Sequence, residues 1–219
     1  PDSGEIEVFG KTFRAGRPKL SHQLGIQTAY QELTLVPDLT VTQNMLLPYE
    51  PGTAGQINRR ESHRRVKEIL ERLELSYVRP SALVSDLDLP TRQKIEIAKA
   101  IGRQPKILLL DEPTSTLSAA DVDWLGRQID ALRDAQVTIM FISHRLPEVR
   151  RFCESLTVLR NGLHAGSYPI GEVADEDVVR LIIGRSLGTI YSTLSDHRDR
   201  DAPHPALQAK DITAGPLLS

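Results

Sequence analysis

Apolar residues recur at helical spacing in the stretch from residue 58 to residue 75. One face of a helix would carry the four apolar residues Val66, Ile69, Leu70 and Leu73. Asn58 and Glu61 precede them with the spacing of a capping box, in which each side chain accepts the other residue's backbone N–H. The other positions are rich in arginine and are interpreted as a solvent-exposed face. The pattern predicts an amphipathic helix beginning at residue 58.

Two further apolar runs show no alternation. They read KILLLDEP, at residues 106–113, and VTIMFIS, at residues 137–143. Continuous runs of this length are typical of parallel strands that are covered on both faces. Both runs are therefore predicted to be buried strands.

Helices are predicted on either side of the first of these strands. One covers about residues 90–103, with Asp88 as its N-cap and Pro90 in its first turn. The other begins at Ser118 and Asp121 and leads towards the second strand. Alternating strands and helices of this kind predict an α/β fold with a parallel sheet.

The two ends of the chain differ from this middle part. The first 30 residues are predicted to form short strands and turns. Beyond the second buried strand the pattern predicts a helix near 146–152, a strand at 155–160, a turn at Asn161-Gly162 and a helix at 175–184. Residues 188–205 are polar and contain proline, which is typical of a linker, and residues 206–219 resemble the first strand of a further domain.

Composition narrows the possible classes of protein. The chain has 219 residues with 27 Lys+Arg and 29 Asp+Glu, so its net charge of -2 argues against a general nucleic-acid binder. Its length favours one α/β domain with an insertion. Its longest apolar runs are far below the ~20 residues that cross a bilayer. Cys153 is the only cysteine, so no internal disulfide is possible and a reducing cytoplasm fits best. The chain opens at Pro1 without a signal segment and is interpreted as a possible fragment.

Three candidate reactive side chains follow the two buried strands. Asp111 and Glu112 end the first strand, and His144 lies just after the second. Ligands collect outside the carboxyl ends of parallel strands, so all three side chains are expected in one crevice, provided that Pro113 turns the chain. One carboxylate could then hold a hard cation while the other polarises water, as phosphoryl transfer requires. The alternative is that the acids merely end a strand.

The order of the motifs adds a family resemblance. Gln31 follows a strand, and the segments LLLDEP, DEPTSTLS and ISHRLPEV come later in the chain. In this order and spacing they resemble the ATP-binding cassette family, specifically the cassettes of bacterial carbohydrate importers, over about residues 1–187. The resemblance implies a P-loop NTPase-like (RecA-like) parallel sheet that is incomplete at the N-terminus. It also implies an inserted helical subdomain at about 33–103, a linker at 188–205 and a truncated first strand of a second cassette at 206–219.

The resemblance also implies roles for individual residues. Asp111 becomes the Walker B aspartate that holds Mg²⁺, and Glu112 becomes the general base for the attacking water. Gln31 becomes the Q-loop glutamine that reaches the metal and the water, and His144 donates to the γ-phosphate of ATP. ATP and Mg²⁺ are the implied ligands. The loop that contacts the opposing cassette, the D-loop, is assigned to Ser115, Thr116, Leu117 and Ser118.

Three departures from the family pattern stand out. No G-x-x-x-x-G-K-[ST] loop occurs in the 219 residues, so weak ATP binding by this chain alone is expected. Ser118 stands where an aspartate is common. The LSGGQ-like motif is replaced by Leu87, Asp88, Leu89, Pro90 and Thr91.

Asp88 places a carboxylate where the family has a serine that donates to phosphate. Like charges about 4 Å apart repel by ~1 kcal/mol in water, and Pro90 removes an N–H from the helix start. Both residues are also good helix-start residues, and the alternatives are an error in the register of the match or compensation elsewhere. The resulting hypothesis is that the pocket built on Asp111, Glu112 and His144 hydrolyses ATP, whereas the pocket completed by this motif is weak.

The expected function is the energy-coupling ATPase subunit of a carbohydrate importer at the cytoplasmic face of the membrane. Its expected partners are transmembrane permease subunits, a second cassette in the same chain or in a dimer and, indirectly, a sugar-binding protein; no nucleic acid is expected. One alternative is a cassette relic that docks or regulates without hydrolysis. A less favoured alternative is a soluble cassette ATPase that acts on nucleic acid or ribosomes.

Overall fold

The computed structural model describes residues 6–13, 16, 18–53 and 56–184. The chain divides into two compact units, which meet between Glu154 and Ser155, and each unit is described by itself. The linker and the further strand predicted at 188–219 lie outside the described residues.

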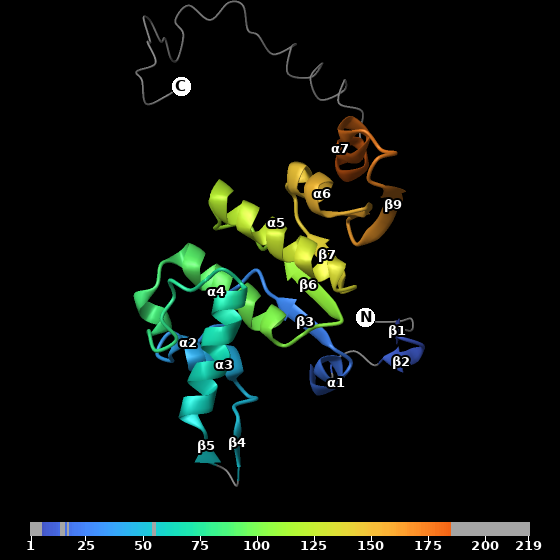
Figure 1. Cartoon of the computed structure of the whole chain (residues 1–219). Helices are drawn as coiled ribbons and strands as arrows, with labels where there is room; N and C mark the ends of the chain where they lie inside the picture. The colour runs from blue at the N-terminus through green and yellow to red at the C-terminus, as the bar shows by residue number, and fades with distance from the viewer. Residues whose placement is uncertain (1–5, 14–15, 17, 54–55, 185–219) are drawn as a thin grey trace, which may run out of the picture. The chain divides into compact units, whose positions relative to one another are not determined.

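A three-stranded parallel sheet forms the centre of the first unit (Figure 1). Its strands are β3 (Ile26–Ala29), β6 (Ile107–Asp111) and β7 (Thr138–Ile142), with β6 in the middle. Leu108 and Leu110 on β6 are fully buried, as the continuous apolar run predicted. The parallel pairing confirms the expected sheet and brings the carboxyl ends of all three strands to one edge.

Strand β7 is less buried than predicted. Met140 is 56% exposed and Ile142 is 47% exposed, whereas Ile139 and Phe141 pack against the core from the other face. Within the part of the chain that the structure describes, β7 pairs with β6 alone and so lies at an edge of the sheet. The prediction that β7 is buried on both faces is therefore wrong, because the absence of polar alternation does not by itself show that both faces are covered.

The helices that flank β6 begin where the sequence predicted. Helix α4 (Leu89–Gly102) is capped by Asp88, whose carboxylate accepts the backbone N–H of Thr91 at 3.0 Å. Helix α5 (Ala119–Asp134) is capped by Ser118, which forms a complete capping box with Asp121. The short helix α6 (Leu146–Phe152) follows β7 and confirms the predicted bounds.

Helices α2 (Val41–Leu46), α3 (Arg59–Arg72) and α4 pack together. Met45, Ile69 and Ile101 of these helices belong to one buried cluster. Asn58 caps α3 as predicted, but the capping box is only half formed, because the Glu61 carboxylate pairs with Arg64 at 2.7 Å. These helices fall within residues 33–103, which were predicted to form a helical subdomain.

Several short elements complete the first unit. They are β1 (Ile6–Val8), β2 (Lys11–Phe13), α1 (Pro18–Gln23), β4 (Gly52–Thr53), β5 (Gln56–Ile57) and a 3-10 turn at Val84–Asp86. Strands β1 and β2 confirm the strands expected near the start of the chain. Helices α1 and α2 were not predicted, because six residues each are too few to show a periodic pattern.

The second unit contains a β-hairpin and a helix. Strands β8 (Ser155–Arg160) and β9 (Leu163–Pro169) are antiparallel, and α7 (Asp175–Ile183) follows them. Asn161 and Gly162 join the strands with φ of 52° and 76°, as the predicted Asn-Gly turn requires. The Arg160 guanidinium donates to the Leu181 carbonyl at 3.1 Å and so fixes the end of α7 against the hairpin.

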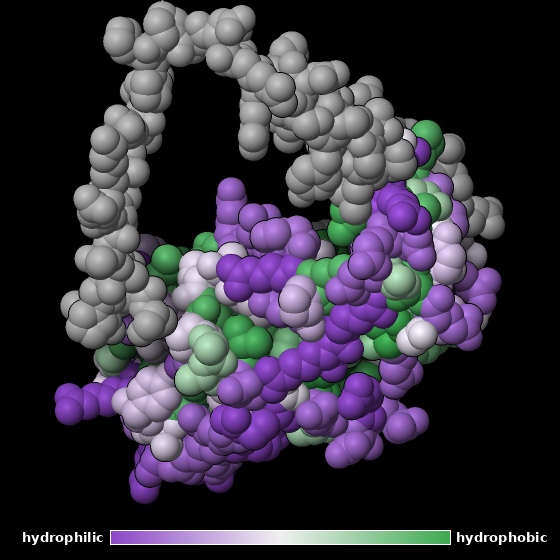
Figure 2. All heavy atoms as spheres, turned by 90° about the horizontal axis from the view of Figure 1, so that it is seen from above, coloured by the Kyte–Doolittle hydropathy of each residue, from purple (hydrophilic) through white to green (hydrophobic). Residues whose placement is uncertain are grey.

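Hydrophilic residues cover much of the face drawn in Figure 2, with smaller hydrophobic areas between them. Among the described helices, none combines the length and the apolar character needed to cross a membrane.

Candidate active site

Glu112 and His144 meet at the carboxyl edge of the sheet. One oxygen of the Glu112 carboxylate, Oε1, lies 2.8 Å from the imidazole Nδ1 of His144 and 3.0 Å from its backbone N. The Glu112 side chain is 15% exposed and the His144 side chain is 76% exposed. A sheltered carboxylate is thus held by an imidazole that remains open to solvent, and these two side chains converge as the sequence predicted.

The backbone at Glu112 explains how the carboxylate reaches His144. The Glu112 N–H donates to the Ile142 carbonyl at 2.9 Å and extends the pairing of β6 with β7 by one residue. Glu112 then adopts φ of 46°, in the left-handed region that residues other than glycine seldom enter. The chain therefore turns at Glu112, one residue earlier than the turn expected at Pro113, and the carboxylate faces the next strand's loop.

Asp111 and Gln31 lie at the same edge of the sheet. Asp111 is the last residue of β6 and pairs in register with Ile142, two residues before His144. Gln31 lies two residues beyond Ala29, which pairs with the residue preceding Asp111. Asp111 is partly buried and Gln31 is exposed. The topology therefore brings the ends of the three strands that carry these four residues to one edge.

The second carboxylate oxygen of Glu112 differs from the first in its hydrogen bonding. Glu112 Oε2 is buried and has no hydrogen-bond partner. A buried carboxylate oxygen without a donor is unfavourable, which makes it a ready acceptor for a water molecule or another donor. Among the described residues, no group of three or more His, Cys, Asp or Glu side chains is arranged to hold a metal ion by itself.

The segment from Leu87 to Thr91 forms the start of α4. Two hydrogen bonds from Thr91, one from its side chain and one from its backbone, hold the pKa of Asp88 below its ordinary value. Leu89 is 50% exposed and Thr91 is buried. In this structure the Asp88 carboxylate serves as the N-cap of α4.

The segment from Ser115 to Ser118 links the site to α5. The Ser115 N–H donates to the Glu112 carbonyl at 3.3 Å, and Ser118 ends the segment as the cap of α5. Asp121 of that cap also binds Lys94 of α4 at 2.7 Å. The hydrogen bond from Lys94 is the main reason why the pKa of Asp121 is lowered.

The Lys94–Asp121 ion pair was not predicted from the sequence, and neither was a role for Glu148. Glu148 belongs to the segment ISHRLPEV but received no predicted role, although its carboxylate accepts the hydroxyl of Thr114 at 2.6 Å. The signal available in the sequence was an acid in the first turn of a predicted helix directly after His144.

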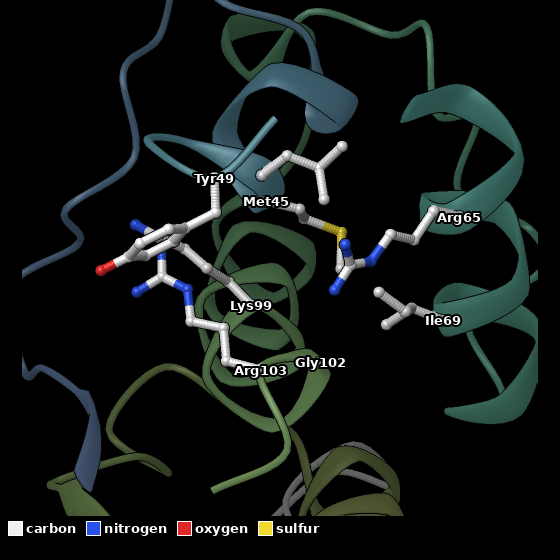
Figure 3. Close-up of a pocket in the computed structure, with 8 residues that line it drawn as sticks. Met45, Tyr49, Arg65, Ile69, Lys99, Gly102 and Arg103 are labelled. Carbon is white, nitrogen blue, oxygen red and sulfur yellow. The ribbon is translucent and has the colours of Figure 1, made fainter. Parts of the chain in front are cut away.

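Two other features do not belong to the site. Gly10, Lys11 and Thr12 have the G-K-[ST] sequence with which a phosphate-binding loop ends. They lie instead in the turn and the second strand of the β1–β2 hairpin. A cavity of about 30 Å³ lies between α2, α3 and α4, where Arg65, Lys99 and Arg103 surround Met45 and Tyr49 (Figure 3). A cavity of this size holds about one water molecule, so it does not fit a nucleotide.

The sequence profile of the ABC transporter family matches residues 1–115, which is more than half of the chain. The chain belongs to the ABC transporter family. This confirms the family resemblance carried by the motifs.

Curated relatives are similar over most of the chain. A protein of Rhizobium johnstonii named "Ribose import ATP-binding protein RbsA 1" is 38% identical over 100% of this chain and 42% of its own length. The "Arabinose import ATP-binding protein AraG" of Rhizobium meliloti is 39% identical over 87% of this chain and 37% of its own length. The chain therefore spans about two fifths of the length of these ABC family members.

Solved structures support the fold. A crystal structure of an ATP-binding cassette of an ABC transporter in its ADP conformation superimposes with a TM-score of 0.68 and 23% sequence identity, over 84% of this chain and 78% of that chain. A nucleotide-free cassette gives a TM-score of 0.66 with 21% identity, over 84% of this chain and 74% of that chain. The predicted P-loop NTPase-like fold class is thereby confirmed.

Proposed function

We propose that this chain is part of the ATP-hydrolysing subunit of a bacterial carbohydrate importer. The observation that carries the proposal is the Glu112–His144 contact at the sheet edge, in a member of the ABC transporter family. The names of its relatives, which refer to ribose and arabinose import, support a sugar as the transported substrate. ATP is the proposed substrate of the hydrolytic step.

Glu112 is proposed to act as the general base. The His144 backbone N–H and ring Nδ1 fix one oxygen of the carboxylate, while its buried, unpartnered oxygen is proposed to orient a water molecule for attack on the γ-phosphate once a nucleotide binds. His144 is proposed to donate to the phosphoryl oxygens, where its exposed ring can reach a bound nucleotide. The role of Glu112 is general base catalysis, which contributes about 10² to 10⁴ in rate, whereas the role of His144 is electrostatic stabilisation of the transition state.

Asp111 and Gln31 are proposed to hold Mg²⁺. A carboxylate and an amide oxygen at one sheet edge match the ligand preference of this ion, which takes few protein ligands and completes its shell with water and phosphate. The bound ion would neutralise charge on the phosphates. Ser115 to Ser118 and Leu87 to Thr91 are proposed to face a second cassette, as D-loop and weakened signature motif.

The polypeptide that contains this chain is proposed to act at the cytoplasmic face of the membrane. Its proposed partners are permease subunits, contacted through the helices of residues 33–103, a second cassette and, indirectly, a sugar-binding protein. Because the 219 residues hold no G-x-x-x-x-G-K-[ST] loop, hydrolysis is expected from the complete polypeptide and not from these residues alone.

A hydrolysis assay on the complete polypeptide tests this proposal. We expect phosphate release that depends on ATP and Mg²⁺ and that is lost in Glu112→Gln. Disruption of the gene is expected to lower uptake of labelled ribose, arabinose or galactose. The carboxylate of Asp88 at the start of α4, which would repel a phosphate placed there, favours the second candidate, a cassette that docks or regulates without hydrolysis. Wild-type protein without hydrolysis but with retained permease binding would decide for that candidate.

A further inference from the structure

Glu148 is a buried acid in the first turn of α6, and it lies between two loops of the candidate site. It is 9% exposed, although glutamate is among the residue types that are seldom buried. A buried carboxylate is stable only when several donors satisfy it. The donors that satisfy Glu148 come from both sides of the site.

One donor belongs to the loop after β6. The hydroxyl of Thr114, which is 0% exposed, donates to Oε2 of Glu148 at 2.6 Å. Thr114 lies two residues after Glu112, within the turn that aims the Glu112 carboxylate. This bond therefore fixes the far side of that turn to α6.

The other donors belong to the loop after β7, on either side of His144. The Ser143 hydroxyl lies 3.5 Å from Oε2 of Glu148, and the Arg145 guanidinium lies 3.3 Å from Oε1. The Ser143 hydroxyl also accepts the Arg145 backbone N–H at 3.0 Å. The loop that carries His144 is thus held to the same carboxylate as the loop that carries Glu112.

We propose that Glu148 is a positioning residue that ties these two loops together and so keeps Glu112 and His144 in contact. Neither loop is a helix or a strand, so the 2.8 Å contact between Glu112 and His144 depends on the relative positions of the two loops. A shared buried anchor fixes their separation before any ligand binds, which is the condition for a preorganised site. The inference concerns the arrangement of the site, and only its kinetic test rests on the proposed function.

The test uses the complete polypeptide and three variants. Glu148→Met removes both acceptor oxygens, and Thr114→Val removes the shortest bond from the other side with a side chain of the same shape. Asp123→Asn is the control, because it removes the charge from the exposed 2.7 Å pair between Asp123 on α5 and Arg151 on α6, the helix of Glu148, and leaves Glu148 untouched. If Glu148→Met fails to fold, Thr114→Val carries the test.

We expect Glu148→Met and Thr114→Val to lower kcat by about 10- to 100-fold with little change in KM for ATP. The reason is that Glu112 and His144 are displaced, whereas the residues that bind ATP are not. The double variant should be no worse than Glu148→Met, since both changes remove the same bond. The control should keep kcat within about twofold, as expected for an exposed pair. A kcat in Thr114→Val equal to that of the control would overturn the inference.

A second measurement judges the inference without any hydrolysis. In protein labelled with ¹⁵N-histidine, the Nδ1 signal of His144, assigned by its loss in His144→Gln, reports the bond to Glu112. We expect it to shift towards that of Glu112→Ala, which has no acceptor for the ring, in both Glu148→Met and Thr114→Val, and to stay in place in Asp123→Asn. An unmoved signal refutes the positioning role even if the wild type is active. A wild type without ATPase activity refutes the proposed function but leaves this measurement valid.

Discussion

The carboxylate of Glu112 receives the backbone N–H and faces the ring Nδ1 of His144 with a single oxygen, at 3.0 and 2.8 Å. Glu112 therefore fixes both the main chain and the side chain of His144. His144 also fixes the orientation of Glu112, so that the remaining oxygen has a defined direction.

Glu112→Gln should abolish hydrolysis while keeping the loop in place. The glutamine carbonyl oxygen can still accept the His144 N–H, but the amide cannot take a proton from water. We expect the hydrolysis rate of the complete polypeptide to fall by about 10²- to 10⁴-fold with a small change in melting temperature. Arg127→Gln, which breaks an exposed pair with Glu74, is the matched control and should keep wild-type turnover. Equal turnover in both variants would remove Glu112 from the mechanism.

Asp88→Ser separates the two roles of residue 88. Serine is as good an N-cap as aspartate, so stability should be retained, whereas Asp88→Ala should cost about 1 kcal/mol of unfolding free energy. In the proposed signature motif, serine would also supply the hydroxyl that the family resemblance implies at this position. We expect Asp88→Ser to raise ATP hydrolysis by the complete polypeptide, and unchanged or lower hydrolysis would show that the carboxylate does not weaken the motif.

The cap formed by Asp88 should also depend on pH. Because its folded-state pKa is lowered by the bonds from Thr91, the ionised carboxylate stabilises the folded state above its unfolded pKa of about 3.9. That stabilisation is lost as the pH falls through the lowered folded-state pKa. Urea unfolding at pH 7 and pH 3 should show a smaller difference between wild type and Asp88→Ala at the lower pH, and an equal difference would argue against an ionic cap.

Much of this arrangement could be predicted from the sequence, because it depends on local patterns. The apolar run of β6, the caps at Asp88 and Ser118 and the Asn161-Gly162 turn all arise from neighbouring residues. Convergence of Glu112 and His144 followed from the rule that ligands collect at the carboxyl ends of parallel strands.

The rest depends on contacts between distant residues. Glu148 meets Thr114 across 34 positions, and nothing in the sequence near either residue indicates that bond. The exposure of Met140 likewise depends on which strands lie beside β7, and an apolar run looks the same in either case.

Lys94 and Asp121 join α4 to α5 through a partly buried ion pair. Lys94→Met removes the charge but keeps the length of the side chain, and it leaves the Asp121 carboxylate with its Ser118 bonds only. We expect a loss of about 1 to 3 kcal/mol in unfolding free energy, measured by chemical denaturation. The loss should be mostly absent when Asp121→Asn is already present, and an additive effect would contradict a direct interaction.

Trp124 joins α5 to the end of α3. Its indole Nε1 donates to the Leu73 carbonyl at 2.7 Å and satisfies one of the carbonyls that a helix end leaves free. Trp124→Phe keeps most of the packing but leaves this buried carbonyl unpaired, so a loss of about 1 to 3 kcal/mol is expected in thermal or urea unfolding. Arg133→Gln, which breaks only the exposed pair with Asp130, should change stability by less than about 1 kcal/mol.

The left-handed backbone at Glu112 sets a limit for protein engineering. At φ of 46° glycine or asparagine would relax the turn, and a search for thermostable variants would tend to select them there. Such a variant would gain heat resistance at the one position where the proposed base must stay acidic. A library screened for melting temperature alone should therefore enrich proteins that fold but do not hydrolyse ATP, unless residue 112 is held constant.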